Sequence, residues 1–299
     1  MTVLHICAFK DICAFILETM QEDYALNLDI KYVKNANEAH DDLMQQHADI
    51  VFMSYDDTLS MAVQDNYHDI AAFMPIHGGI LDLCGNLDLY AGKNRVGIDT
   101  NTGYARALRL YMRNRYPNYQ DYQQISWLMA GATNVRYEKL MDSQIDATLL
   151  NPPFSYQDGI HCIGALSGNA VIPYYQGVVA NLNKSWLDKP SHQHALCEFI
   201  KIYQQVLAVM RNMPEETISK LAKFYELPNT VVSAIYDRLW EDDGLNTTID
   251  FNEQALKQTE QIFYQDTKLE VPQSRYWVLS NPATEKLRFS VCKNHQKAK

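Results

Sequence analysis

Short apolar segments alternate with helix-like segments along the first half of the chain, and this alternation limits the folds that it can adopt. Residues 3–9, 28–33 and 48–53 have the composition of buried strands, whereas 12–23 and 37–46 carry apolar residues at helical spacing. When a helix of this length connects two strands, the two strands usually lie parallel to each other in the same sheet. The pattern therefore predicts an α/β protein built from βαβ units around a parallel sheet.

The alternation continues to about residue 180 and then gives way to helices. The further expected strands cover residues 70–76, 80–84, 96–98, 125–129, 147–150, a segment near Cys162, and 174–181. The further expected helices cover residues 58–64, a segment from about 104, and 134–142, 193–211, 214–225, 229–240 and 252–264. Past residue 271 the pattern fades, and the basic residues within 286–299 are expected to form a mobile tail.

This order of elements fits two α/β lobes, with the second lobe inserted into the first. We expect lobe 1 to comprise residues 1–90 plus 176–270, lobe 2 to comprise 91–175, and 271–299 to form a partly mobile C-terminal extension. Chain crossings near 89–92 and 174–177 would then act as the hinge between the lobes.

Composition and charge exclude several classes of protein. Hydrophobic residues make up 47% and charged residues 21% of the 299 residues, as in ordinary globular domains. The net charge of −10 disfavours a nucleic-acid partner, because binding phosphates requires a basic face. No apolar window reaches the length of a transmembrane helix, so we expect no membrane insertion.

The cysteines and the N-terminal residues favour the cytoplasm. The six cysteines include no CxxC pair, and most lie in apolar runs that are typical of buried thiols in a reducing compartment. The first residues lack the basic segment and the small-residue cleavage site of a secretion signal. We therefore expect a cytoplasmic protein, with a periplasmic location as the alternative if a signal peptide was removed.

Two strand ends indicate where a ligand would bind. Residues 95–105 (RVGIDTNTGYA) have the pattern of a strand, a turn of small polar residues and the start of a helix. A helix that opens in this way has free N–H groups and a positive dipole end that suit a polar or anionic ligand. Residues 145–154 (IDATLLNPPF) form a second strand that stops at Asn151. Open α/β sheets bind ligands at such edges, so the sequence predicts a small-molecule cleft.

These segments also resemble a known family. The runs 48–54, 92–103 and 145–154 are similar to type 2 periplasmic solute-binding proteins, in the group that includes receptors for sulfonates, nitrate and thiamin-pyrimidine precursors, and thiamin-pyrimidine-synthase-like proteins. Weaker matches follow in the same order, and the resemblance covers roughly residues 2–265. It implies a two-lobed fold with a ligand between the lobes. The cysteine-rich motif of the synthases is missing from this chain.

The strand ends and the resemblance together give a set of candidate ligand contacts. From lobe 1 they are Phe9, Lys10, Asp11, Ser54, Tyr55, Asp56 and His77; from lobe 2 they are Thr100, Asn101, Thr102, Asn134, Asn151 and Phe154, with Tyr174 at the return crossing. Some of these residues have a simpler structural interpretation. Thr100 and Thr102 would also serve as a helix N-cap, and His77 would also fit a surface turn. Lys10 suits an anionic ligand, although a lysine at a strand end is usually solvated.

The leading hypothesis is a non-catalytic protein that closes its lobes around a small polar or anionic metabolite. The alternative is a cytoplasmic enzyme on the same scaffold that acts on a thiamin-pyrimidine or menaquinone precursor. Catalytic patterns are weak, because there is no P-loop or GxGxxG motif and His192 and His194 would face different sides of one helix. We expect no cofactor and no metal. The expected partners are the small-molecule ligand and, if the protein is exported, a transporter permease.

Overall fold

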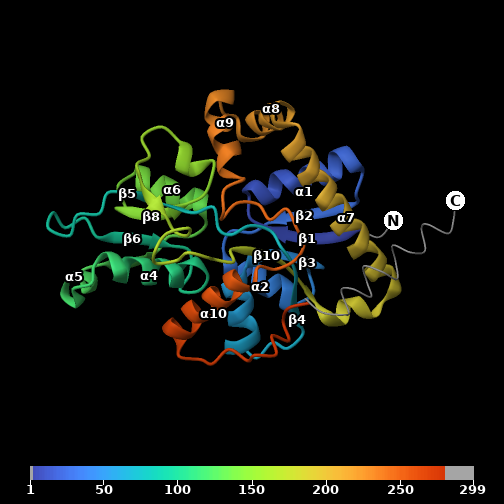
Figure 1. Cartoon of the computed structure of the whole chain (residues 1–299), viewed down its shortest axis with the longest axis horizontal. Helices are drawn as coiled ribbons and strands as arrows, with labels where there is room; N and C mark the ends of the chain where they lie inside the picture. Colours follow the sequence, from blue (N-terminus) through green and yellow to red (C-terminus); the bar gives the residue numbers. More distant parts are fainter. Residues whose placement is uncertain (1–2, 280–299) are drawn as a thin grey trace.

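The computed structural model describes residues 3–279, and in it two five-stranded sheets lie along the long axis of the molecule (Figure 1). The first sheet has the order β2 (Leu28–Tyr32), β1 (Leu4–Ala8), β3 (Ile50–Ser54), β10 (Val178–Asn183) and β4 (Ile70–Pro75). The second sheet has the order β7 (Ser126–Met129), β6 (Arg95–Ile98), β8 (Ala147–Leu150), β5 (Asp82–Gly85) and β9 (Cys162–Ala165). We call each sheet with the helices packed on it the first and the second lobe.

Both sheets are mixed, whereas the sequence pattern predicted parallel pairing. The βαβ units give parallel pairs, as expected, between β1 and its neighbours β2 and β3 and between β6 and its neighbours β7 and β8. Strand β10 is antiparallel to β3 and β4, because the chain comes back to the first sheet from the second lobe rather than through a crossover helix. Strand β5 enters the second sheet directly after β4 and is antiparallel to β8 and β9 for the same reason.

The second lobe starts earlier in the chain than residue 91, where the sequence predicted its start, because β5 pairs with strands of the second sheet. Residues 82–85 belong to the second sheet, although residues 1–90 were expected in lobe 1. The connections between the sheets are therefore residues 76–81 and 166–177. The expected hinge at 89–92 is wrong, because this segment is a turn within the second lobe, between β5 and β6. The expected hinge at 174–177 does lie in a connection, and the remaining lobe limits stay a prediction.

Helices cover both faces of the first sheet. The described helices are α1 (Ile12–Tyr24), α2 (Ala36–Met44), α3 (Tyr55–Leu59, continued by a π-helical turn at Ser60–Gln64), α4 (Tyr104–Arg115), α5 (Tyr119–Gln123), α6 (Thr133–Met141), α7 (Pro190–Asn212), α8 (Pro214–Tyr225), α9 (Asn229–Arg238) and α10 (Glu253–Thr267). Of these, α4, α5 and α6 belong to the second lobe, because they lie between β6 and β8 in the chain. In β3, Phe52 packs edge-on against Phe199 of α7, while its neighbour Met53 belongs to the core shared with α2 and α10. The first lobe therefore has three layers, with the sheet in the middle.

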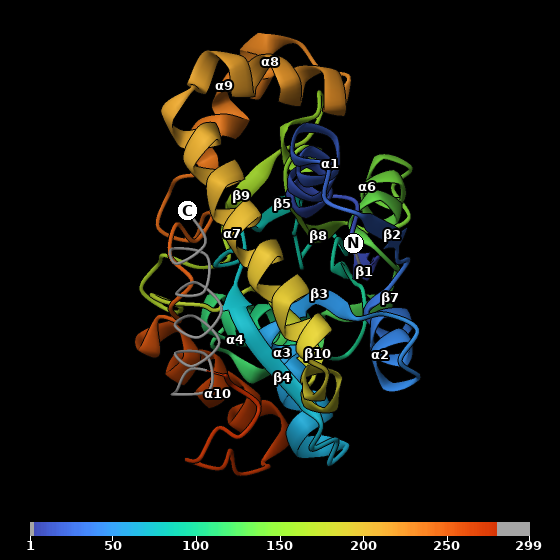
Figure 2. The same cartoon turned by 90° about the vertical axis from the view of Figure 1, so that its right-hand side faces the viewer.

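Figure 2 shows α7 running along the first lobe, with α8 and α9 at one end of the molecule and α10 at the other. Helix α10 packs against α3 of the first lobe and α4 of the second, so it bridges the two lobes. The second lobe has its own core, in which Val96 of β6 and Leu108 of α4 are buried. Among residues 3–279, no helix has the length and apolar character that crossing a membrane requires.

The start of the C-terminal extension packs against the first sheet. Trp277 is completely buried, and its carbonyl accepts the Ala72 N–H at 2.7 Å, while Leu279 donates to the Ala72 carbonyl at 2.9 Å. Residues 271–279 thus include part of the core, although their sequence shows no periodicity. The tail at 286–299, which was expected to be mobile, and Cys292 lie outside the described residues.

The described cysteines are less uniformly buried than their apolar surroundings suggested. Cys7, Cys13 and Cys84 are buried, whereas Cys162 is exposed. Cys84 and Cys162 are direct partners on the antiparallel strands β5 and β9. The exposure of Cys162 follows from the position of β9 at the edge of its sheet.

Candidate functional site

A cavity of about 740 Å³ lies between residues of the two lobes. The first lobe contributes the segments after β1 and β3 and the connection at His77, and the second lobe contributes the segments after β6 and β8. A third set of lining residues, Phe224, Tyr225 and Glu226, comes from the C-terminal end of α8. The volume suits a ligand of metabolite size.

Ten of the fourteen candidate residues line this cavity: Phe9, Lys10, Asp11, Ser54, His77, Thr100, Thr102, Asn134, Asn151 and Phe154. They come from six segments that are far apart in the sequence, and these segments lie at or after the carboxyl ends of strands. The strand-end rule therefore selected the edge of each sheet at which the cavity lies. Contact of these residues with a ligand stays a prediction.

The other four candidates, Tyr55, Asp56, Asn101 and Tyr174, do not line the cavity. Tyr55 is fully buried, where its hydroxyl donates to Glu260 at 2.8 Å. Asn101 is exposed, and Tyr174 has 45% of its surface exposed. These four side chains miss the cavity because successive residues in a turn point in different directions. Reaching the correct strand end is therefore not enough to place a side chain in the cavity.

Asp56 instead joins the two lobes. Its Oδ1 accepts the Gly103 N–H at 2.9 Å and pairs with the guanidinium of Arg106 in α4. Arg106 also donates to the Ser60 hydroxyl at 2.8 Å. Asp56 and Arg106 are almost completely buried, so this contact holds α3 of the first lobe against the start of α4.

Thr100 and Thr102 do not cap α4, contrary to the simpler interpretation of their positions. The N-cap residue is Gly103, whose backbone N–H is taken by Asp56. The two threonine hydroxyls lie 2.9 Å apart and bond to each other at the wall of the cavity. They are therefore placed where a ligand could compete for their hydrogen bonds.

Asp57 faces the cavity beside Asp56. The Ser54 hydroxyl lies 2.7 Å from Asp57 Oδ2, and His40 Nε2 lies 3.6 Å from Asp57 Oδ1. Although burial alone would raise it, the partners His40 and Ser54 hold the pKa of Asp57 below its usual value. Burial also acts against a charged His40, but the Asp57 carboxylate raises the pKa of that imidazole. Asp57 is therefore ionised at neutral pH.

Asp99 is a lining residue that the sequence analysis did not select, although it follows directly after β6. Its Oδ1 has no hydrogen-bond partner among the described residues. Burial raises the pKa of Asp99, Arg136 opposes this effect, and the negative charge of Asp57 adds to it. The same strand-end rule that selected Thr100 would have found Asp99.

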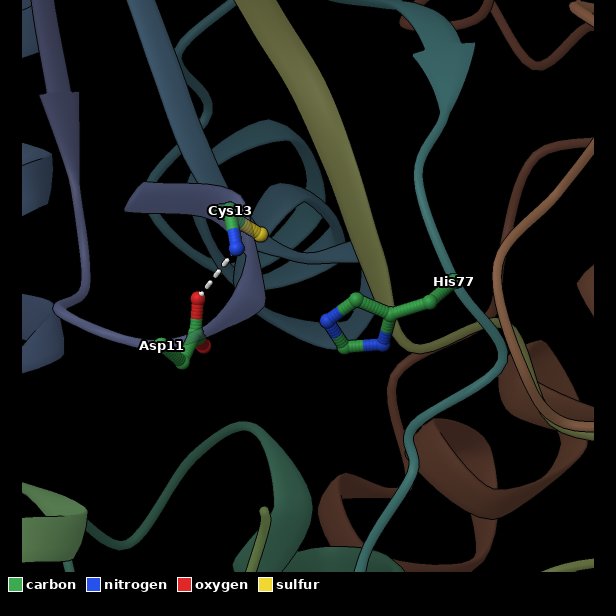
Figure 3. Close-up of side chains that lie close together, drawn as sticks. All are labelled: Asp11, Cys13 and His77. Atoms are coloured by element: carbon green, nitrogen blue, oxygen red, sulfur yellow. Dashed lines mark hydrogen bonds between the residues drawn. The ribbon is translucent and has the colours of Figure 1, made fainter. Parts of the chain in front are cut away.

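A group of three side chains lies at one end of the cavity (Figure 3). The polar atoms of Asp11, Cys13 and His77 lie within 4.8 Å of one another, and all three residues are buried. Asp11 caps α1 by accepting the Cys13 N–H at 2.8 Å, and Asn151 Nδ2 lies 3.3 Å from its other oxygen. Burial raises the pKa of Asp11 to about 6. No sequence spacing indicated this group, because His77 reaches it only through the fold.

His77 and Cys13 each carry a proton that a metal ion would have to displace. Gly79 N–H donates to His77 Nδ1 at 3.1 Å, so the ring proton is on Nε2, which points toward Asp11 and Cys13 in Figure 3. A metal needs a lone pair on that nitrogen and a thiolate sulfur. Burial and then the charge of Asp11 raise the pKa of the Cys13 thiol well above its usual value, so the sulfur stays protonated. The group therefore offers hydrogen-bond donors and a carboxylate to the cavity.

His77 is buried rather than placed in a surface turn. Burial lowers its pKa to about 4, so the ring is neutral at physiological pH. Its Nε2 has no hydrogen-bond partner among the described residues, and neither has Asn151 Oδ1. Buried polar atoms without a partner are uncommon in folded proteins, and they mark positions that a ligand or water can satisfy.

No protein-family model matches the chain, and no curated protein matches it. Solved structures do match along almost the whole chain. The ligand-binding component of an ABC-type import system from Staphylococcus aureus, described with zinc bound, superposes with a TM-score of 0.72 over 96% of this chain and 98% of its own, at 14% identity. The alkanesulfonate-binding protein from Xanthomonas axonopodis, bound to MOPS, gives 0.66 over 90% and 94%, also at 14% identity.

A conserved Candida albicans gene product, described as having the generic periplasmic binding protein fold, gives a TM-score of 0.69 over 94% of this chain and 97% of its own, at 12% identity. The chain has the periplasmic-binding-protein fold. These identities establish the fold alone. The expected cytoplasmic location gains no support from neighbours such as the Escherichia coli aliphatic sulphonate binding protein, which is described as periplasmic.

Proposed function

We propose that this chain binds a small polar metabolite in the cavity between its lobes. The observation that carries this proposal is the cavity itself, in which buried polar atoms of His77 and Asn151 have no partner among the described residues. Aromatic and aliphatic side chains provide the apolar part of the wall, and an apolar wall with a few polar groups is typical of small-molecule sites. The alternative of an enzyme is not favoured, because the solved structures that superpose on this chain include the ligand-binding component of an import system and an alkanesulfonate-binding protein.

We also propose that the lobes open and close through residues 76–81 and 166–177. These connections pack backbone against backbone: a Cβ atom on Gly177 would lie 2.4 Å from Gly79 N. Gly79 itself has a φ of +135°, which only glycine adopts readily.

The partner and the location belong to the same proposal. The Staphylococcus aureus neighbour is described as part of an ABC-type import system. If this chain is exported, we expect it to deliver its ligand to a transporter permease. If it remains in the cytoplasm, we expect a role in binding or delivering the same metabolite there.

The test is a ligand screen with a cavity variant and a matched surface variant. A panel of small metabolites is scored by the rise in melting temperature, and each hit is measured by calorimetry. Asn151→Ala should weaken binding roughly 5- to 150-fold, because a hydrogen bond lost in a closed cavity costs about 1–3 kcal/mol. Asn114→Ala is the control, because that amide is exposed and donates only to Leu110 in its own helix. Equal affinity in both variants would contradict the proposed site, and mass spectrometry of the recovered ligand tests for turnover.

A further inference from the structure

The buried charges of the cavity are mostly negative. Asp11 and Asp57 are buried, Asp99 is half-buried, and all three line the cavity. The one buried cation among the lining residues is Arg136. His40 is not a lining residue but lies 3.6 Å from Asp57 and balances part of its charge. The lining itself holds three carboxylates and one buried guanidinium, and this excess of negative charge repels an anion and attracts a cation, because burial strengthens charge interactions.

Arg136 has little left to offer an anionic ligand. Its Nη1 donates to the Gly131 carbonyl at 2.6 Å, and its Nη2 donates to Thr133 Oγ1 and to the Leu149 carbonyl, each at 3.1 Å. Its Nε also lies 3.4 Å from the Leu149 carbonyl. Each of its three nitrogen atoms is therefore engaged by the protein. Arg136 fixes the loop after β7 to the end of β8 and balances part of the charge of Asp99.

Two helix N-termini that could attract an anion are already occupied by carboxylates of the protein. Asp11 accepts the Cys13 N–H at the start of α1, and Asp56 accepts the Gly103 N–H at the start of α4. These side chains neutralise the positive ends of the two helices. An anionic ligand would therefore have to displace a buried carboxylate from either of these two N-termini, whereas α6, whose first residues also line the cavity, begins without a side-chain cap.

The remaining cations of the lining are at its solvent side. Lys10 and Lys34 are exposed, as is Glu226. Water and salt screen such charges strongly, so they affect the interior of the cavity less than the buried carboxylates do. The aromatic lining acts in the same direction as the carboxylates. Phe9, Phe154 and Phe224 line the cavity, and the faces of aromatic rings attract cations.

We propose, on the basis of the binding function above, that the ligand carries a positively charged nitrogen that is held by Asp57 and Asp99. These carboxylates come from opposite lobes, since Asp57 lies in α3 and Asp99 follows β6. Asp99 Oδ1 has no hydrogen-bond partner among the described residues, and Asp57 Oδ1 makes no hydrogen bond there, although His40 Nε2 lies 3.6 Å from it. A cation between them removes the repulsion that opposes closure. Ligand charge and lobe closure are thereby coupled.

The experiment compares four-carbon probes that differ in charge. The probes are putrescine and butylammonium as cations, succinate and butanesulfonate as anions, and 1,4-butanediol as the neutral compound. Each is titrated into the full chain, and binding is followed by melting temperature and by ligand-detected NMR. The same titrations are run on Asp99→Asn and on Asp158→Asn, which changes the net charge equally at an exposed position outside the cavity.

We expect the cations to bind at least about tenfold more tightly than the neutral and anionic probes, and Asp99→Asn, but not Asp158→Asn, to remove most of that preference. Anions that bind while cations do not would overturn this inference and leave the binding function standing. Cations that bind equally well to Asp99→Asn would overturn it too, because the charge would then act elsewhere. Failure of every probe, whatever its charge, would count against both proposals.

Discussion

The contact between Asp56 and Arg106 should be a main source of stability, and Asp56→Asn is the change that tests it. Arg106 is 4% exposed, so a neutral partner leaves a buried guanidinium without its main counter-charge. Breaking a buried ion pair from one side costs about 3–5 kcal/mol. Asparagine keeps the shape of aspartate and can still accept the Gly103 N–H, so the loss reports the charge rather than a cavity.

The expected loss lies near the lower limit of that range, at about 3 kcal/mol, because Arg106 has a second acidic neighbour. Its Nε lies 3.4 Å from Asp266 Oδ2, and that carboxylate is also held by Arg109. For a chain of this size, about 3 kcal/mol corresponds to a fall in melting temperature of roughly 6–10 °C. The measurement is urea unfolding, monitored by circular dichroism and by tryptophan fluorescence. The two unfolding transitions must coincide for the free energy of unfolding to be defined.

A double-mutant cycle separates the ion pair from other effects. Arg106→Met leaves Asp56 alone, whereas the double variant Asp56→Asn with Arg106→Met removes both charges and should be more stable than Asp56→Asn alone. Asp23→Asn is the control, since it breaks an exposed pair with Lys220 and should cost less than about 1 kcal/mol. The reasoning is refuted if Asp56→Asn unfolds within about 0.5 kcal/mol of the parent, or if the double variant recovers nothing.

Asp11→Asn should gain stability relative to the parent as the pH rises from about 4 to 6, and the difference should then level off. The reason is that the pKa of Asp11 is about 6 in the folded protein and 3.8 in the unfolded chain, so ionising Asp11 costs the parent stability between these values. Urea titrations at several pH values measure this difference in the free energy of unfolding. His77 should make the parent less stable at low pH. Its pKa is about 4 in the folded protein and 6.5 in the unfolded chain, so the parent loses up to about 1.4 kcal/mol of stability per pH unit as the pH falls through this interval, whereas His77→Gln does not. Gly177→Ala should reduce the ligand-induced compaction seen by small-angle scattering, because its Cβ would lie 2.4 Å from Gly79 N, whereas Gly164→Ala has ordinary contacts and should behave as the parent. Diamide should join Cys84 to Cys162 with loss of both thiol hydrogens, because the two residues are opposite on β5 and β9; peptide mapping that finds both thiols intact would contradict this.

Local patterns predicted the elements but not the direction of every strand. Helix α8 was expected at 214–225 and is found at Pro214–Tyr225, because an early proline and apolar spacing are properties of the segment itself. The antiparallel direction of β5 and β10 depends on how the chain passes between the lobes, which no local pattern contains. Trp277 shows the same limit, since its burial depends on contact with β4, about two hundred residues earlier in the chain.

The site could be predicted to the level of strand ends and no further. Thr100 and Asn151 were found because each lies within two residues of the end of a strand that reaches the cavity. The residues Phe224 to Glu226 were missed because they end a helix and carry no pattern that indicates a ligand. The proximity of His77 to Cys13 depends on the path of the connection after β4, because β3 and β10 lie between β1 and β4 in the first sheet.

The neighbours Asp56 and Asp57 show how one turn of chain can connect binding to closure. Asp56 is fully buried and bonds to Gly103 of the second lobe, while Asp57 lines the cavity. A Cβ atom on Gly103 would lie 3.0 Å from Asp57 Oδ2, so the same glycine contacts both carboxylates. The lobes therefore meet at this buried edge, and the cavity must open at its exposed lining residues, such as Lys10 and Asn134. A ligand that enters there and reaches Asp57 contacts α3, the helix in which Asp56 bonds to the second lobe.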